Sequence, residues 1–327
     1  MKTMKALLPE KFLKKVKKQK YQVVGRHTGV KACRWLRKAL TGEGFCYKQK
    51  FYGIKSHRCL QMTPTLGFCT NHCLHCWRNE PEELGYQWDE QLIENVEDPD
   101  SPSDIIEGCL KAQKRILSGY KPIGHEKVTW ERWNEAMEPN QVAISLSGEP
   151  TLYPFLNDLI DAFNARRMTT FLVTNGTRPN VLAELTAPTM LYISIYGPDK
   201  QTYLRVARPI ELNNWEKLNE SLELMNSFDS NTVLRLTLIN DLNLKNPEGY
   251  AKLIEKANPT FVEAKSYVFV GPSRARLQFE HMPTHSQIQT FSKQLSTLTG
   301  YNVLDESKPS RVVLLSKLKK KINVYKE

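Results

Sequence analysis

The feature that most constrains the fold is a repeated alternation of short apolar strands with helices. The sequence predicts six strands, within residues 60–68, 141–147, 169–174, 190–195, 231–238 and 261–270. Each strand precedes a helix or a helical segment, and this order is typical of a parallel sheet covered by helices. We therefore expect an α/β fold in which the strands form a partial TIM-type (βα)6 barrel.

Two further segments flank the predicted barrel. Residues 1–58 are expected to form a basic N-terminal extension, residues 59–283 the barrel core, and residues 284–327 a C-terminal extension. Within the C-terminal extension, the pattern predicts a helix over about 284–299 and a strand over 311–315.

The composition indicates a protein of a reducing compartment. No stretch approaches the roughly 18 to 20 continuous apolar residues that a membrane span needs. The charged N-terminal run leads to no apolar segment of the kind found in a secretory signal. Seven cysteines in 327 residues do not make a disulfide scaffold, which favours thiolates kept for metal. We expect a cytoplasmic monomer without a membrane partner.

The positive charge is concentrated at the N-terminus. Residues 1–58 contain 17 Lys or Arg and 2 acidic residues, whereas residues 59–327 contain 29 basic and 33 acidic residues. Aromatic residues alternate with the cations over 21–58, as in proteins that stack unpaired RNA bases. The segment therefore predicts an RNA partner. For residues 11–20, a solvated tail that only promotes solubility is the alternative.

Three closely spaced cysteines follow the first predicted strand. Cys69, Cys73 and Cys76 are separated by four and three residues. Three thiolates so spaced can bind three irons of a cubane cluster and leave the fourth iron open to a ligand. The alternative is a structural zinc held by these thiolates with His72 or His75.

Polar residues follow the next strands, where the loops of an α/β barrel build its active site. In the run 145–151, Gly148 allows close backbone approach and Glu149 can accept a hydrogen bond from a ligand ammonium group. The alternative is an ordinary strand-to-helix turn, in which Glu149 lies near the helix N-terminus because its negative charge is favourable there. Asn175 and Ser194 are expected to bind a ribose or carboxylate of a cofactor, or else to be turn residues.

A second set of thiols precedes the barrel. Cys33, Cys46 and Cys59 are each separated by thirteen residues, whereas a zinc finger keeps two ligands two to four residues apart. Three such thiolates again leave one iron of a cubane open. Cys33 lies on a predicted helix over 31–40, so the alternative to a metal ligand is a cysteine buried in the core. The stretch from Cys46 to Cys59 is expected to be a loop or strand-like.

These motifs together resemble a known family. The three-cysteine run resembles that of the radical S-adenosylmethionine superfamily, and Ser147-Gly148-Glu149 resembles its Gly-Gly-Glu motif with serine at the first position. A run ending Cys-Trp-Arg-Asn at 76–79, preceded by cysteines at thirteen-residue intervals, resembles the tRNA 4-demethylwyosine synthase family in its archaeal single-domain form. The resemblance covers essentially the whole chain. It departs at His75, where an aromatic residue is common.

The resemblance implies a radical-SAM fold and two [4Fe-4S] clusters. Cys69, Cys73 and Cys76 would hold the radical cluster, whose open iron binds S-adenosyl-L-methionine. It also implies a lyase-type condensation of N1-methylguanosine, next to the anticodon of tRNA-Phe, with two carbons of pyruvate. A 5′-deoxyadenosyl radical takes a hydrogen from the N1-methyl group. The resulting carbon radical adds to the keto carbon of pyruvate, the carboxylate carbon leaves, and the exocyclic amine closes the third ring.

The resemblance also assigns the second set of thiols. Cys33, Cys46 and Cys59 would hold an auxiliary cluster whose open iron chelates pyruvate. Lys48 lies two residues after Cys46, and we expect it to form a Schiff base with pyruvate or to pair with its carboxylate. Contact with RNA is the alternative for this lysine. The electron donor would be a separate flavodoxin- or ferredoxin-like protein.

Two other functions remain open at this point. One is another radical tRNA-modifying enzyme, such as a methylthiotransferase, which also uses two three-cysteine clusters. The other is a zinc-stabilised RNA-binding protein without catalytic activity.

Overall fold

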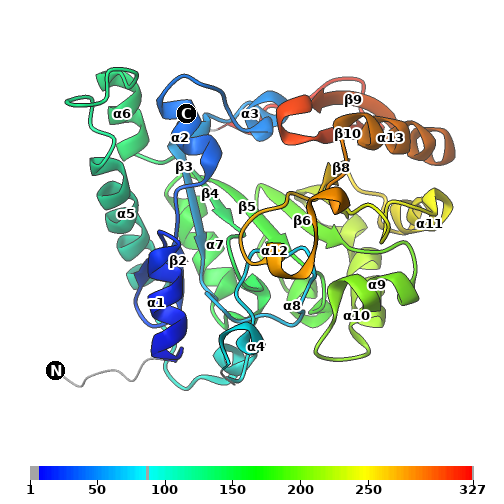
Figure 1. Cartoon of the computed structure of the whole chain (residues 1–327), viewed down its shortest axis with the longest axis horizontal. Coiled ribbons are helices and arrows are strands. Elements are labelled where there is room, and N and C mark those ends of the chain that lie inside the picture. Colours follow the sequence, from blue (N-terminus) through cyan, green and yellow to red (C-terminus); the bar gives the residue numbers. More distant parts are fainter. Residues whose placement is uncertain (1–6, 86–87, 326–327) are drawn as a thin grey trace. The chain divides into compact units, whose positions relative to one another are not determined.

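The computed structural model describes residues 7–85 and 88–325 (Figure 1). Residue contacts divide the chain into two compact units. Unit 1 comprises the residues up to Cys69, Asn79–Leu172 and the residues from Asn323, and unit 2 comprises Thr70–Arg78 and Val173–Ile322.

Unit 1 contains a mixed sheet. Its strands are β1 (Gln22–Val24), β2 (Thr28–Val30), β3 (Cys59–Thr63), β4 (Gln141–Ile144) and β5 (Thr169–Thr174), of which the last two residues belong to unit 2. β1, β2 and β3 pair antiparallel in that order, whereas β3, β4 and β5 run parallel. In the parallel part Cys59 pairs with Gln141, and Gln141 pairs with Thr169. The carboxyl ends of these three strands therefore lie at one edge of the sheet.

The helices of unit 1 follow local sequence signals. They are α1 (Glu10–Lys18), α2 (Arg34–Leu40), α3 (Tyr47–Tyr52), α4 (Pro81–Leu84), α5 (Pro102–Ser118), α6 (Trp130–Met137) and α7 (Leu156–Ala165), with 3-10 turns η1 (Ser56–Arg58), η2 (Leu92–Asn95) and η3 (Pro150–Leu152). In α5, the Ser101 hydroxyl accepts a 3.2 Å hydrogen bond from the amide of Asp104, and Pro102 occupies the first turn. Such caps fix where a helix begins.

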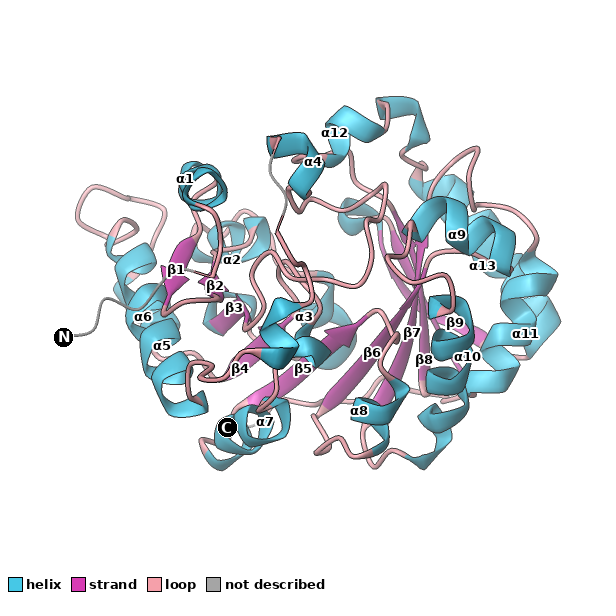
Figure 2. Ribbon diagram, turned by 90° about the horizontal axis from the view of Figure 1, so that it is seen from below, coloured by secondary structure: helices cyan, strands magenta, loops and turns pink. Residues whose placement is uncertain are grey.

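Unit 2 is built on three parallel strands that lie side by side in Figure 2: β6 (Met190–Ile195), β7 (Asn231–Leu238) and β8 (Phe261–Ser266). Two C-terminal strands extend this sheet antiparallel, β10 (Val312–Ser316) beside β8 and β9 (Asn302–Ser307) beside β10. The helices are α8 (Pro179–Ala183), α9 (Lys200–Ala207), α10 (Asn214–Leu224), α11 (Pro247–Ala257), α12 (Ser273–Arg276) and α13 (His285–Thr299), with turns η4 (Met225–Ser227), η5 (Phe279–His281) and η6 (Lys308–Ser310).

The predicted fold class is confirmed. All six expected strands form and pair in parallel within each unit, and the C-terminal helix and strand form as α13 and β10. One local prediction is wrong, because the stretch from Cys46 to Cys59 contains α3 and η1. The helix α3 ends at Gly53, whose φ of 78° is readily adopted by glycine, and six residues are too few to show a helical period.

The predicted segments 1–58, 59–283 and 284–327 are defined by charge and sequence motifs. The two units are defined by residue contacts, so they do not test these boundaries. The segment division therefore stays a prediction. None of the helices within residues 7–85 and 88–325 has the length and apolar character that crossing a membrane requires.

Candidate functional site

Unit 1 brings the three widely spaced thiols together. Cys33 and Cys46 precede the first residues of α2 and α3, and Cys59 is the first residue of β3. The Cys33 sulfur accepts a 3.3 Å hydrogen bond from the amide of Leu36, while the Cys46 amide donates to the Ser56 hydroxyl at 2.9 Å. The amides at the start of α2 lower the pKa of the Cys33 thiol, but burial is the larger effect and raises it overall.

The thiol pKa values show that the three cysteines and Lys48 are electrostatic neighbours. Burial raises the pKa of the Cys59 thiol, and Cys33 and Cys46 raise it further because like charges repel. The positive charge of Lys48 lowers the pKa of both the Cys59 and the Cys33 thiol. The structure thus unites residues that are thirteen positions apart in the chain.

Lys48 lies on α3, with its ammonium group 4.0 Å from the centre of the Phe171 ring. Both residues belong to unit 1. A cation over an aromatic face is attracted by the ring, which helps to orient the Lys48 ammonium group. This orientation suits a lysine that acts on a small substrate beside the three thiols.

The Gly148 turn is packed against the chain just before Cys69. Gly148 has a φ of 121°, and a Cβ there would overlap the Thr65 carbonyl oxygen and lie 2.7 Å from that of Phe68. The amide of Glu149 donates to the Phe68 carbonyl at 2.8 Å. Only glycine permits this approach of the turn to the protein backbone, whereas cofactor binding by Gly148 stays a prediction.

The carboxylate of Glu149 is buried and hydrogen-bonded within its own turn. One of its oxygens accepts from the amide of Thr151 at 3.2 Å and from the Thr151 hydroxyl at 2.7 Å. These bonds fix the orientation of the carboxylate, as a binding group for a cationic ligand requires.

His27 is a supporting residue that the sequence patterns did not indicate. Its buried Nδ1 donates to the Pro64 carbonyl at 2.5 Å, and its own carbonyl accepts from the Leu66 amide at 2.7 Å. Nε2 accepts from the amide of Asp100 at 3.0 Å. His27 thereby holds the segment between β3 and Cys69.

Cys69 belongs to unit 1, where its amide donates to the Glu90 carbonyl at 3.0 Å. Cys73 and Cys76 belong to the loop of unit 2, in which Cys73 is buried. The amide of Cys76 donates to the carbonyl of Cys73 at 3.0 Å, so these two residues form one tight turn.

Arg78 closes the unit 2 loop on itself. Its side chain is buried, and its guanidinium donates to the Asn71 carbonyl at 2.9 Å. The loop also pairs with the C-terminal end of α9, since the amides of His72 and Leu74 donate to the carbonyls of Arg208 and Val206 at 3.0 Å. Arg78 was visible in the Cys-Trp-Arg-Asn motif, but nothing in the spacing predicted this role.

His75 lies beside an aromatic residue. Its ring lies 4.7 Å from that of Tyr196, the residue after β6. Burial, together with the nearby Arg276, lowers the pKa of His75 to about 3, so the ring is neutral. Arg276 also donates to the carbonyls of Leu74 and Cys76.

Asn175 and Ser194 are both buried in unit 2. The Asn175 amide nitrogen donates to the Thr70 hydroxyl at 2.8 Å, and its oxygen accepts from the Thr177 hydroxyl at 2.8 Å. Asn175 therefore positions the residue that follows Cys69. Ser194 lies on β6, opposite Arg235 of β7.

Within the part of the chain that the structure describes, no three His, Cys, Asp or Glu side chains converge on a single metal-ion position. A cubane cluster requires a different arrangement, since each protein ligand binds a different iron. The two sets of three thiols supply the donors that such clusters use.

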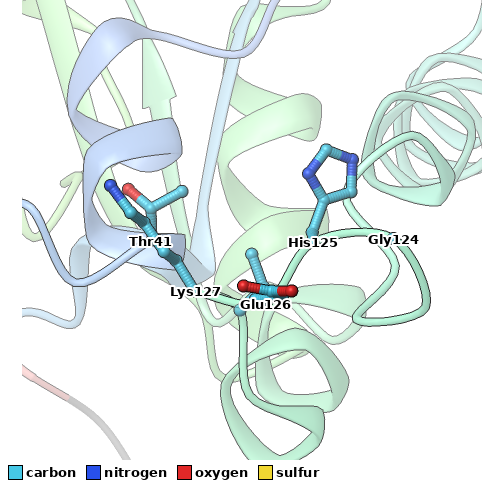
Figure 3. A pocket seen from close by; sticks show the side chains of 6 residues that line it. Thr41, Gly124, His125, Glu126 and Lys127 are labelled. Carbon is cyan, nitrogen blue, oxygen red and sulfur yellow. The ribbon is translucent and has the colours of Figure 1, made fainter.

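A surface pocket of about 480 Å³ lies elsewhere in unit 1 (Figure 3). Thr41 at the end of α2 faces the turn before α6, which contributes Gly124, His125, Glu126, Lys127 and Val128. None of the predicted site residues lines it.

Comparisons with known proteins identify the family. The Radical SAM superfamily profile matches residues 63–254, and the profile for wyosine base formation matches residues 256–317. The S-adenosyl-L-methionine-dependent tRNA 4-demethylwyosine synthase of Pyrococcus abyssi is 50% identical over 94% of this chain and 89% of its own length. The chain belongs to the tRNA 4-demethylwyosine synthase family.

Other members of this family give the same result. The synthase of Methanocaldococcus jannaschii is 39% identical, over 97% of this chain and 99% of its own. A solved structure of TYW1 with a lysine–pyruvate adduct bound is 37% identical, with a TM-score of 0.86 over 97% of this chain and 99% of that one. The radical-SAM fold and a function in wyosine biosynthesis on tRNA are thereby confirmed, and membership implies S-adenosyl-L-methionine and a [4Fe-4S] cluster.

Proposed function

We propose that this enzyme condenses N1-methylguanosine, next to the anticodon of tRNA-Phe, with two carbons of pyruvate to form 4-demethylwyosine, using two [4Fe-4S] clusters. The observation that carries the proposal is the electrostatic proximity of Cys33, Cys46 and Lys48 to Cys59 within unit 1. A radical enzyme with one cofactor site needs no second set of thiols.

Cys69, Cys73 and Cys76 are proposed as ligands of the radical cluster, with its remaining iron left to S-adenosyl-L-methionine. When bound, these two groups supply the one-electron chemistry that removes a hydrogen atom from the N1-methyl group. Glu149 is proposed to accept from the methionine ammonium group, because its buried carboxylate is already oriented by Thr151.

Gly148, Asn175 and Ser194 are proposed to complete the cofactor site. Gly148 lets the turn carrying Glu149 approach the backbone before Cys69. Ser194 offers a buried hydroxyl to the ribose or carboxylate, whereas binding by Asn175 would exchange one of its bonds to Thr70 or Thr177. Arg78 keeps the cysteine loop in one conformation.

Cys33, Cys46 and Cys59 are proposed to hold the auxiliary cluster, next to which pyruvate binds. Lys48 orients pyruvate there. We favour the Schiff base over the ion pair: the Nζ atom attacks the keto carbon, and water leaves as the C=N bond forms. The lysine–pyruvate adduct of the related TYW1 structure supports this version, since Lys48 adjoins three thiols in a matching fold.

Electrons are proposed to come from a separate flavodoxin- or ferredoxin-like protein, and the enzyme is proposed to act as a cytoplasmic monomer. These assignments follow from the family resemblance.

The function is tested by incubating the anaerobic enzyme with N1-methylguanosine-containing tRNA-Phe, S-adenosyl-L-methionine, dithionite and pyruvate. Nucleoside mass spectrometry should then detect 4-demethylwyosine, and omission of pyruvate should abolish it. A methylthio nucleoside, or an unchanged N1-methylguanosine together with bound zinc, would contradict the proposal.

The two clusters are tested by iron analysis of a Cys33→Ala, Cys46→Ala, Cys59→Ala variant after anaerobic reconstitution. We expect about half the iron of the unaltered enzyme, because one of two four-iron clusters is lost. Equal iron in the two proteins would reject the auxiliary cluster. Cys109, which is buried on α5, provides the control, since Cys109→Ala should keep all the iron.

A further inference from the structure

The lysine-rich helix α1 (dark blue in Figure 1) packs against residues 66–68, which precede the first cysteine of the proposed radical cluster, Cys69. Phe12 and Val16 of α1 are buried in one apolar cluster with Leu66 and Phe68 from that segment. The same cluster contains Leu146, from the turn that carries Glu149. A tail that served only for solubility would not bury these residues.

Phe12 of α1 packs against Gly67, two residues before Cys69. A Cβ at Gly67 would lie 2.8 Å from the Cζ atom of Phe12, so the ring rests directly on this glycine. On its other side Phe12 packs edge-on against Trp88, with 5.2 Å between ring centres. Glu90 follows Trp88 by two residues, and its carbonyl accepts from the Cys69 amide.

The end of α1 is held by the residue that follows the cysteine loop. Gln19 caps α1, and its side-chain oxygen accepts from the Asn79 amide nitrogen at 3.2 Å. The reverse bond, from Gln19 to the Asn79 oxygen, measures 3.5 Å. Asn79 is the last residue of the Cys-Trp-Arg-Asn motif. Unit 1 therefore fixes α1 at residues that precede and follow the loop in sequence.

The opposite face of α1 is strongly basic. Lys14, Lys15, Lys17 and Lys18 are exposed, and Glu10 is the acidic residue that accompanies them. Glu10 pairs with Lys14 at 2.7 Å. Lys15, Lys17 and Lys18 add further positive charge to this helix, which packs in one apolar cluster with Leu146 from the turn that carries Glu149.

We propose that α1 is a phosphate-binding face for the anticodon arm of the substrate tRNA, with Lys15, Lys17 and Lys18 as the contacting residues. The inference rests on the proposed function, which places a tRNA nucleobase at the radical site. RNA is favoured because the positive charge continues from α1 through residue 58 with few acidic residues among it. The expected stacking surface is not general, since Tyr21, Tyr47, Phe51 and Tyr52 are buried. An acidic electron-donor protein is the competing partner, and the test separates the two.

The test measures binding of N1-methylguanosine-containing tRNA-Phe to the reconstituted enzyme at several salt concentrations. Lys15→Gln, Lys17→Gln, Lys18→Gln should weaken binding about tenfold or more and lower the salt slope by about 2, since each phosphate contact contributes roughly 0.7 to 0.9. Glutamine preserves helix propensity. The matched control is Lys111→Gln, Lys114→Gln, Lys252→Gln, which removes three exposed charges from α5 and α11 and should bind like the unaltered enzyme.

A second variant tests whether the lysines act from a fixed position. Phe12→Ala removes the ring on Gly67 without changing charge and should weaken tRNA binding to a similar extent. Unaltered affinity in either variant, or an equal loss in the control, would overturn the inference. So would slower reduction by a flavodoxin with unchanged tRNA affinity.

Failure of the inference is distinguishable from failure of the proposed function. Each variant is also assayed for 5′-deoxyadenosine release with dithionite in the absence of tRNA, which reports the radical site alone. Formation of 4-demethylwyosine by the unaltered enzyme tests the function, whereas the comparison of salt slopes tests α1.

Discussion

The Arg276 guanidinium donates a hydrogen bond of 3.2 Å to the carbonyl oxygen of Leu74, between Cys73 and Cys76. It also donates to the Cys76 carbonyl. Arg276 lies in the part of the chain that matches the wyosine profile, whereas the cysteine loop lies in the part that matches the general radical profile. A family-specific segment thus stabilises the loop that is common to the superfamily.

Replacement of Arg276 by alanine should slow cleavage of S-adenosyl-L-methionine about tenfold or more. Two carbonyls lose a charged donor, and each such hydrogen bond is worth about 1.5 to 3 kcal/mol. The rate of 5′-deoxyadenosine release with dithionite measures the effect. Arg274→Ala is the control, because Arg274 lies on the same helix α12, exposed and stacked on Phe269. Equal rates in both variants would show that the loop does not depend on Arg276.

Replacement of Gly148 by alanine should destabilise the protein by more than about 3 kcal/mol, since the methyl group would overlap two carbonyl oxygens in a strained conformation. Gly124→Ala is the matched control, because Gly124 has a φ of 92° but no neighbour within 4 Å of an added Cβ. The control should cost about 1 to 2 kcal/mol, from the backbone conformation alone. Urea unfolding of both variants measures the difference, and similar losses would contradict the close approach at Gly148.

The sequence could predict the strands and the thiols because both are encoded locally. The strands β6 and β7 are apolar runs bounded by turns, and Cys69, Cys73 and Cys76 carry their spacing within eight residues. The auxiliary thiols were identified by equal intervals and family resemblance, yet their convergence depends on α2, α3 and β3 together.

The supporting residues could not be predicted in the same way. Arg276 is 200 residues from Cys76, and His27 is 37 residues from Pro64, so no local period relates them. A lone arginine or histidine on a polar segment gives no signal of the carbonyl it will bind. The role of Gln19 likewise appears only once α1 is packed against Asn79.

His27 should make stability depend on pH below about 6.5. Burial lowers the pKa of His27 below its usual value, although Asp100 acts in the opposite direction. Below about pH 6.5 the unfolded chain binds a proton that folded His27 does not, so the free energy of unfolding falls as the pH decreases, by at most about 1.4 kcal/mol per unit.

The comparison of His27→Gln with the unaltered protein isolates this contribution. Urea unfolding at pH 7.5 and pH 5.5, values chosen on either side of about 6.5, should show a smaller decrease in stability for the variant. His125→Gln serves as the control, since His125 is exposed and should keep the full pH dependence. A variant with the same decrease as the unaltered protein would mean that His27 is not responsible.

Replacement of Lys48 by arginine should separate the two roles proposed for this lysine. Arginine keeps the positive charge and can pair with the pyruvate carboxylate, but it cannot form a Schiff base because it does not lose its proton. If Lys48 forms the covalent adduct, Lys48→Arg should lose borohydride trapping of labelled pyruvate and formation of 4-demethylwyosine. Iron content and S-adenosyl-L-methionine cleavage should stay unchanged, because neither needs the amine.

Lys50→Arg is the matched control for this prediction, since Lys50 lies two residues further along α3 and is exposed. It should retain both the adduct and the product. A Lys48→Arg enzyme that still forms 4-demethylwyosine at more than about a tenth of the original rate, a loss of less than about 1.4 kcal/mol in transition-state stabilisation, would favour the ion pair. The lysine would then orient pyruvate by charge alone, and the auxiliary cluster proposed at the three thiols would supply the Lewis acid that polarises the keto group.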